Sequence, residues 1–107
     1  MNKSIKQTQQ KSFNKEYFKV YENDFKREQM YNQEIKRIHK FIDKGRILDV
    51  GCGIGKFLFL FDKNKWDRYG VEVSDYAIKE SRKLGIKVKD NNQYDYVENF
   101  FDVIVFR

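Results

Sequence analysis

A turn with alternating glycines constrains this chain more than any other feature. The apolar run Ile47–Val50 is interrupted only by Asp49, and a second apolar run, Phe57–Phe61, follows a few residues later. The first run is typical of a buried parallel strand, and the second is typical of the start of a helix. Between them lie three alternating glycines, Gly51, Gly53 and Gly55. Because glycine adopts positive φ freely and lets a ligand approach bare backbone, the stretch predicts a strand, a tight ligand-binding turn and a helix.

The spacing of the glycines disfavours one class of nucleotide-binding turn. The dinucleotide fingerprint requires G-x-G-x-x-G, but here its last glycine would fall on Lys56 or Leu58. A dinucleotide-dependent oxidoreductase would suit the same topology, yet it fails on this spacing. Asp49 precedes the first glycine by two residues, where its carboxylate would repel a pyrophosphate. The turn therefore favours a ligand with positive charge, such as a sulfonium or an amine.

Strand and helix patterns alternate after the turn. Tyr69–Val73, Ile86–Val88 and Phe101–Phe106 are typical of strands. Between the first two of these, Ser74 can cap a helix that ends at Gly85. This order predicts an α/β fold with about four parallel strands and connecting helices.

The N-terminal part has a different pattern. Residues 1–12 are rich in Lys, Gln and Ser, and we expect a disordered basic and polar tail. Residues 13–45 place apolar side chains at helical spacing, which predicts one or two leading helices. Asn23 and Asp24 mark a possible break between them, and Gly45 is the expected C-terminal cap. Residues 46–107 then form the α/β domain.

Composition narrows the class of protein. The 107 residues lack an apolar run of membrane-spanning length and begin with polar sequence, so we expect a cytoplasmic protein that does not contact membranes. The formal charge of +6 comes from residues 1–46, with twelve Lys and Arg against six Asp and Glu. Cys52 is the single cysteine, so it forms no internal disulfide. It fits the turn as a small residue, and without a neighbouring His a catalytic thiol is disfavoured.

The motifs from Asp49 onward resemble those of the class I S-adenosylmethionine-dependent methyltransferases. The resemblance implies a Rossmann-like sheet and S-adenosylmethionine as cofactor. It implies that Glu72 accepts hydrogen bonds from the ribose hydroxyls, that Val73 lies against the adenine, and that Asp90 or Asn91 meets the adenine amino group. Backbone N–H groups at the start of the helix after the turn would suit the methionine carboxylate. The turn that would hold the methionine part consists of Asp49, Gly51, Cys52, Gly53 and Gly55.

The same resemblance indicates the reaction. The chain most resembles the type 11, 12 and 23 groups of small-molecule and sugar-directed methyltransferases, which implies methyl transfer to a small molecule or a sugar. Enzymes that methylate exocyclic amines of nucleic acid bases carry Asn or Asp and two prolines at about the position of Arg107. This chain has no Pro, which disfavours nucleic acid as a substrate. No catalytic base is assigned, and no metal ligands are assigned.

Two further expectations concern assembly and function. The chain ends one residue after an apolar strand, so we expect a Rossmann-like sheet truncated after its fourth strand, with little turnover of its own. The edge of that strand could pair with a second copy to form a homodimer. The alternative function is a non-catalytic nucleotide-binding module whose basic leading helices bind RNA or a protein partner.

Overall fold

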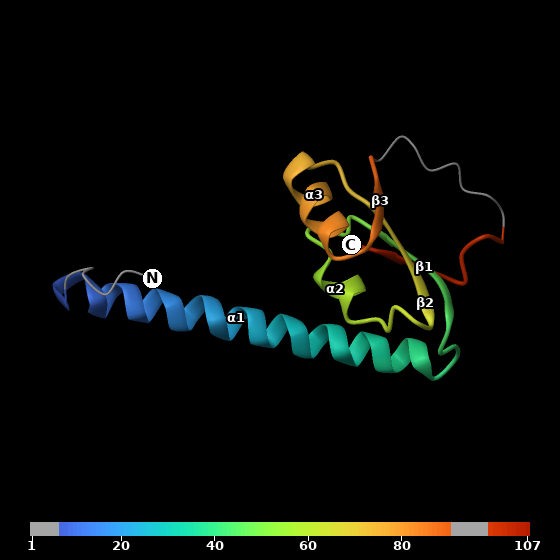
Figure 1. The fold of residues 1–107 in the computed structure, drawn as a ribbon. Helices are drawn as coiled ribbons and strands as arrows, with labels where there is room; N and C mark the ends of the chain where they lie inside the picture. The colour runs from blue at the N-terminus through green and yellow to red at the C-terminus, as the bar shows by residue number, and fades with distance from the viewer. Residues whose placement is uncertain (1–6, 91–98) are drawn as a thin grey trace. The chain divides into compact units, whose positions relative to one another are not determined.

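The chain forms one long helix followed by a small α/β unit (Figure 1). A computed structural model describes residues 7–90 and 99–107, with side chains described from residue 23 onward. The chain divides between Glu34 and Ile35 into two units, and helix α1 (Gln7–His39) contributes to both. The second unit holds the other elements, β1 (Gly45–Val50), α2 (Lys56–Phe59), β2 (Trp66–Val71), α3 (Asp75–Lys83), β3 (Lys87–Lys89) and β4 (Val103–Phe106).

The four strands form one parallel sheet in the order β3-β2-β1-β4. This confirms the predicted α/β fold with four parallel strands. Strand β1 lies between β2 and β4, and Ile47 and Leu48, which point to opposite faces, are both 0% exposed. Helices α2 and α3 lie on one side of the sheet in Figure 1. They cover it with Phe57 and Leu58 from α2 and with Ala77 and Ile78 from α3.

Arg68 joins the ends of two helices to the sheet. Its side chain lies in the core, where the residue is 7% exposed. One guanidinium nitrogen donates to the carbonyls of Leu58 and Phe61 at 3.5 and 3.4 Å, and another donates to the carbonyl of Leu84 at 3.3 Å. These carbonyls lie at the C-terminal ends of α2 and α3, where a cation is favourable. The buried charge is therefore compensated by carbonyl groups at the ends of these helices. The Leu58 carbonyl also accepts the Phe61 amide at 3.1 Å.

The leading helix differs from its prediction in three ways. It begins at Gln7, so residues 7–12 are helical where a disordered tail was expected, because Gln and Lys are good helix formers. It continues through Asn23 and Asp24, since these residues lower helix propensity only modestly when strong helix formers flank them. It also ends at His39, before the expected boundary.

Gly45 was predicted to cap the leading helix, but it is the first residue of β1. Its amide donates to the carbonyl of Lys65 at 3.0 Å, and its backbone pairs with Trp66. A Cβ atom at Gly45 would collide with the carboxylate of Asp102, which accepts a hydrogen bond from the Arg46 amide at 2.8 Å. The glycine is thus needed for a close approach between β1 and the segment that leads into β4. Within the described chain, no helix combines the length and the hydropathy needed to span a membrane.

Candidate functional site

The predicted site lies at the carboxyl ends of the strands. Val50 pairs with Val71 and with Phe106, and Val71 pairs with Lys89. The residues that follow these four form the next row across the sheet, and three of their amides continue the ladder by donating to carbonyls of the neighbouring strand. That row consists of Asp90, Glu72, Gly51 and Arg107. In open α/β sheets this edge is where ligands bind.

The glycine turn has the left-handed backbone that the sequence predicted. The φ angles are 84° at Gly51, 57° at Gly53 and 90° at Gly55. A Cβ atom at Gly55 would lie 2.6 Å from Ile86 Cδ1, so this glycine is needed for packing. A Cβ atom at Gly53 would meet nothing within 4 Å. Gly53 therefore faces open space, as a turn that cradles a ligand requires.

Glu72 connects the second strand to this turn. Its Oε1 accepts a hydrogen bond from the Gly53 amide at 2.9 Å. Its Oε2 accepts from the amides of Val73 and Ser74 at 2.9 and 3.0 Å. The hydrogen bond from Ser74 is the main cause that lowers the pKa of Glu72 below its usual value of 4.5, and those from Gly53 and Val73 add to it. The side chain is thus an ionised carboxylate fixed beside the open glycine.

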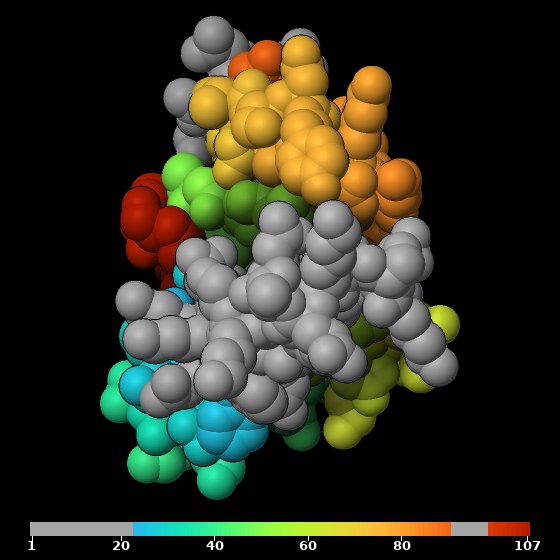
Figure 2. All heavy atoms as spheres, turned by 90° about the vertical axis from the view of Figure 1, so that its left-hand side faces the viewer, coloured from blue at the N-terminus to red at the C-terminus, as the bar shows by residue number. Residues whose placement is uncertain are grey.

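Ser81 on α3 holds the turn through a hydrogen bond. Its side chain is 0% exposed, and its Oγ donates to the carbonyl of Gly53 at 2.7 Å. Figure 2 shows the turn (green) between α3 (gold) and the end of β4 (dark red). The sequence analysis gave Ser81 no role in the site. Its role could have been suspected from the sequence, because Ser81 places a hydroxyl on the same helix face as the apolar residues Ala77 and Ile78.

Asp49 is paired with a residue that the sequence analysis did not assign to the site. Its side chain is 1% exposed, and Arg107 Nε donates to its Oδ1 at 3.3 Å. The guanidinium also lies 4.1 Å from the centre of the Phe57 ring. Asp49 pairs with Gly70, two residues before Glu72, so strand alternation directs both acids to the same side of the sheet. The two carboxylates therefore lie at the same edge of the sheet as the turn.

Cys52 is a packing residue. The side chain is buried, with Sγ 4.0 Å from Ser81 Oγ, and a Cβ atom at Gly70 would lie 2.5 Å from it. Burial is the main cause that raises the pKa of the Cys52 thiol to about 11. The thiol is therefore protonated at neutral pH, and its side chain does not line the open side of the turn. Any contact between Cys52 and a ligand would involve backbone atoms.

The remaining predicted residues extend the site along the same edge. Val73 follows Glu72 and is 67% exposed, so an apolar surface is available there. Asp90 directly follows β3 and is exposed. Asn91 lies outside the described residues.

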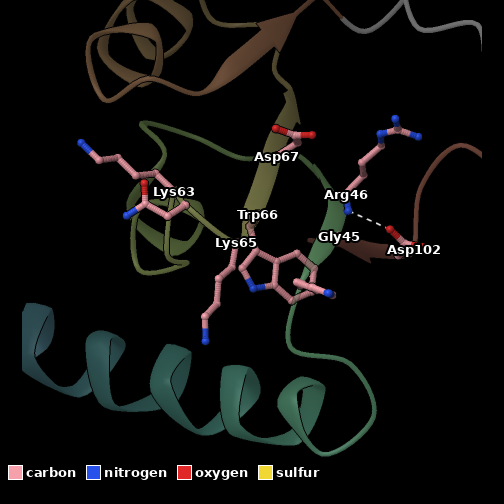
Figure 3. Close-up of a pocket in the computed structure, with 9 residues that line it drawn as sticks. Gly45, Arg46, Lys63, Lys65, Trp66, Asp67 and Asp102 are labelled. Carbon is pink, nitrogen blue, oxygen red and sulfur yellow. Dashed lines mark hydrogen bonds between the residues drawn. The ribbon is translucent and has the colours of Figure 1, made fainter.

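A hollow of about 480 Å³ lies at the opposite edge of the sheet (Figure 3). Lys44, Arg46, Lys63 and Lys65 contribute to its lining together with Asp67 and Asp102. The charged ends of Lys63, Lys65 and Arg46 point away from one another in Figure 3. Two acids and diverging cations do not converge on one ligand, so the carboxyl edge is the better candidate site.

Comparison with known families decides which kind of protein carries this geometry. A family model described as a methyltransferase domain matches residues 24–107. The chain belongs to the methyltransferase domain family. The resemblance stated from Asp49, the alternating glycines and Glu72 is thereby confirmed, and the fold is that of an S-adenosylmethionine-dependent methyltransferase.

Individual relatives show how much of the methyltransferase fold is present. An uncharacterized protein of Methanocaldococcus jannaschii is 36% identical over 73 residues, which are 68% of this chain and 32% of that protein. The structure of CalS10 with S-adenosylmethionine bound, an amino pentose methyltransferase from Micromonospora echinaspora, matches with a TM-score of 0.60 at 23% identity, over 82% of this chain and 41% of that one. A TehB-like methyltransferase from Corynebacterium glutamicum matches with a TM-score of 0.57 at 22% identity, over 80% and 53% of the two chains. The methyltransferase domain described here thus spans about a third of the curated relative and about half or less of these structures.

Proposed function

We propose that this chain binds S-adenosylmethionine at the carboxyl edge of its sheet and is the cofactor-binding part of a methyltransferase. The observation that carries the proposal is the pair of acids, Asp49 in β1 and Glu72 after β2, on the same side and edge of the sheet as the open glycine Gly53. Family membership and the likeness to a structure with S-adenosylmethionine bound support it.

The residues of the edge suit different parts of this cofactor. Glu72 is ionised and held in place, so its remaining lone pairs can accept charge-assisted hydrogen bonds from ribose hydroxyls. Val73 offers an exposed apolar side chain to the adenine face, and Asp90 stands one strand further along to accept from an exocyclic amine. Asp49 favours a positively charged group over the turn. Asn91, the other residue expected near the adenine amino group, stays a prediction.

The chemistry requires orientation more than covalent help from the protein. When bound, the cofactor supplies an activated methyl group on a sulfonium. The chain's own contribution is to fix the nucleoside against a preformed carboxylate and to hold the turn rigid through Ser81 and Gly55. Because these groups are already in place, little reorganisation is needed on binding.

We further propose that the acceptor is a small molecule or a sugar. The amino pentose methyltransferase shares this fold at 23% identity, which supports a sugar as one candidate acceptor. The N-methylation of nucleic acid bases remains disfavoured, because Arg107 stands where that class carries Asn or Asp. A panel of amino sugars and small hydroxylated acceptors, tested with isotopically labelled methyl donor, would separate these classes.

Calorimetric titration of S-adenosylhomocysteine into the 107-residue chain tests the cofactor proposal. We expect a single binding site, and we expect Glu72→Gln to weaken binding by about 10-fold or more, because hydrogen bonds to charged groups contribute about 1.5–3 kcal/mol. Glu80→Gln is the matched control, since Glu80 lies on α3 and pairs with Lys83 at 3.2 Å. Absence of binding to the unsubstituted chain would contradict the proposal.

Pairing of β4 with a second copy also remains a proposal. In the described sheet β4 lies at an edge, and Ile104 and Phe106 are 43% and 73% exposed. Edge strands with exposed apolar side chains are templates for pairing between chains. Light scattering is expected to give the mass of a dimer, and a monomer at high concentration would contradict this idea.

A further inference from the structure

Arg107 lies beside the glycine turn, and its side chain contacts Asp49. Its amide donates to the Val50 carbonyl at 3.1 Å, so its backbone is fixed to β1. A Cβ atom at Gly51 would lie 3.4 Å from Arg107 Cβ, an ordinary van der Waals distance, so Arg107 lies directly beside the first glycine of the turn. From there the guanidinium reaches over Phe57 to the carboxylate of Asp49.

The ion pair is asymmetric in its access to solvent. The side chain of Arg107 is 26% exposed and that of Asp49 is 1% exposed. A ligand therefore meets the guanidinium first, and it reaches the carboxylate only when the guanidinium moves aside. The Nε–Oδ1 distance of 3.3 Å is longer than the roughly 2.7–2.9 Å of a strong charge-assisted hydrogen bond. This contact is one that a better-placed cation could replace.

Replacement of Arg107 by a ligand cation at Asp49 must keep the charges of the site balanced. A cation that displaced Arg107 from Asp49 would leave the guanidinium without its carboxylate, in a site that is partly buried. A ligand that carries an ammonium and a carboxylate on adjacent positions avoids this cost. Its ammonium pairs with Asp49 and its carboxylate pairs with Arg107, so one ion pair becomes two.

We propose that the Asp49–Arg107 ion pair recognises the zwitterionic amino-acid end of the cofactor and thereby makes Arg107 a specificity-determining residue. This inference rests on the proposed function, because it assigns one part of the same ligand. It differs from the expectation that backbone amides of the turn alone hold the carboxylate. A nucleoside without an amino-acid end gains nothing from Arg107.

Two probes isolate this contact. S-Adenosylhomocysteine and 5′-methylthioadenosine share the adenosine and an uncharged thioether, but only the former has the amino-acid end. Calorimetry would measure both probes against the unsubstituted chain, Arg107→Gln, Arg107→Lys and the control Arg46→Gln. Arg46 is a suitable control because its guanidinium also lies over an aromatic ring, that of Phe100 at 4.4 Å, but its strand position is at the opposite edge of the sheet.

We expect Arg107→Gln to weaken S-adenosylhomocysteine binding by about 10-fold to 100-fold, as loss of a hydrogen bond between charged groups predicts. Binding of 5′-methylthioadenosine should change by less than about 2-fold, Arg107→Lys should restore part of the loss, and Arg46→Gln should change neither. Equal weakening of both probes, or no change in either, would overturn the inference. Failure of the unsubstituted chain to bind either probe would instead overturn the proposed function. Urea unfolding of each variant shows whether it is folded. If Arg107→Gln does not fold, Arg107→Lys still tests the contribution of the guanidinium.

Discussion

The Gly53 amide donates a hydrogen bond to Glu72 Oε1 at 2.9 Å, and this contact joins the turn after β1 to the end of β2. The same carboxylate accepts two further hydrogen bonds from the amides of Val73 and Ser74. A side chain with three backbone donors loses little additional freedom when a ligand binds. The site is therefore organised before the cofactor arrives, and several measurements can test this.

The lowered pKa of Glu72 should make the free energy of unfolding depend on pH. Because backbone hydrogen bonds lower its pKa in the folded state below the usual 4.5, the folded state binds this proton less readily than the unfolded state. The stabilisation is therefore fully present above about pH 4.5 and is lost as pH falls through the folded-state pKa. Urea unfolding of the unsubstituted chain and Glu72→Gln should show a free-energy difference that is constant near neutrality and shrinks in acid. A difference that grows on acidification would contradict this assignment.

Two glycines of the turn should respond differently to alanine. Gly55→Ala places a Cβ 2.6 Å from Ile86 Cδ1 at φ 90°, and we expect a loss of about 2–5 kcal/mol in unfolding free energy from strain and overpacking together. Gly53→Ala meets no neighbour and should lose only about 1–2 kcal/mol through its left-handed backbone.

Gly53→Ala should affect ligand binding more than stability. Gly53→Ala is expected to remain folded yet bind S-adenosylhomocysteine at least about 10-fold more weakly, since the new methyl group would stand in the open space beside Glu72. Unchanged affinity in a folded Gly53→Ala variant would show that the ligand does not approach this glycine.

Cys52 should be chemically inert in the folded chain. With a pKa of about 11, only about a thousandth of the thiol is ionised at pH 8. Alkylation by iodoacetamide should therefore be slow in buffer and fast in concentrated urea, where the thiol recovers its ordinary pKa and exposure. Fast labelling of the native chain would indicate that the turn opens, or that Cys52 faces the site.

Arg68 should matter more for stability than any exposed cation. Its removal takes the guanidinium donor from the carbonyls of Phe61 and Leu84, and a buried unpaired group costs about 1–3 kcal/mol before water enters. The Leu58 carbonyl keeps its hydrogen bond from the Phe61 amide. We expect Arg68→Met to lose about 2–4 kcal/mol in unfolding free energy, whereas Lys79→Met on the exposed side of α3 should change it by less than about 0.5 kcal/mol. Equal effects would show that the carbonyl contacts contribute little.

The sequence was most informative where one physical requirement dominates. Alternating glycines after an apolar run can hardly form anything except a turn, and an acid at the end of the next strand must reach the same edge of a parallel sheet. Gly53 and Glu72 were therefore predictable together. The helix pattern was less reliable, because Asn23 and Asp24 can cap a helix or lie within one, and only the path of the chain decides.

The missed residues are those whose role depends on contacts distant in sequence. Arg68 lies within β2, and only strand alternation with Trp66 and Gly70, both buried, indicates that its side chain points inward. Arg107 follows β4, and its approach to Asp49 depends on the pairing of β4 with β1. Such partners become visible only when the register of the sheet is known.

Amide chemical shifts during a titration with S-adenosylhomocysteine test the location of the site most directly. The account predicts that the largest changes fall on the amides of Gly53, Glu72, Val73 and Asp90 at the carboxyl edge, while Lys65 and Trp66 at the opposite edge remain unchanged. Changes confined to Lys65, Trp66 and the basic hollow around them would contradict it.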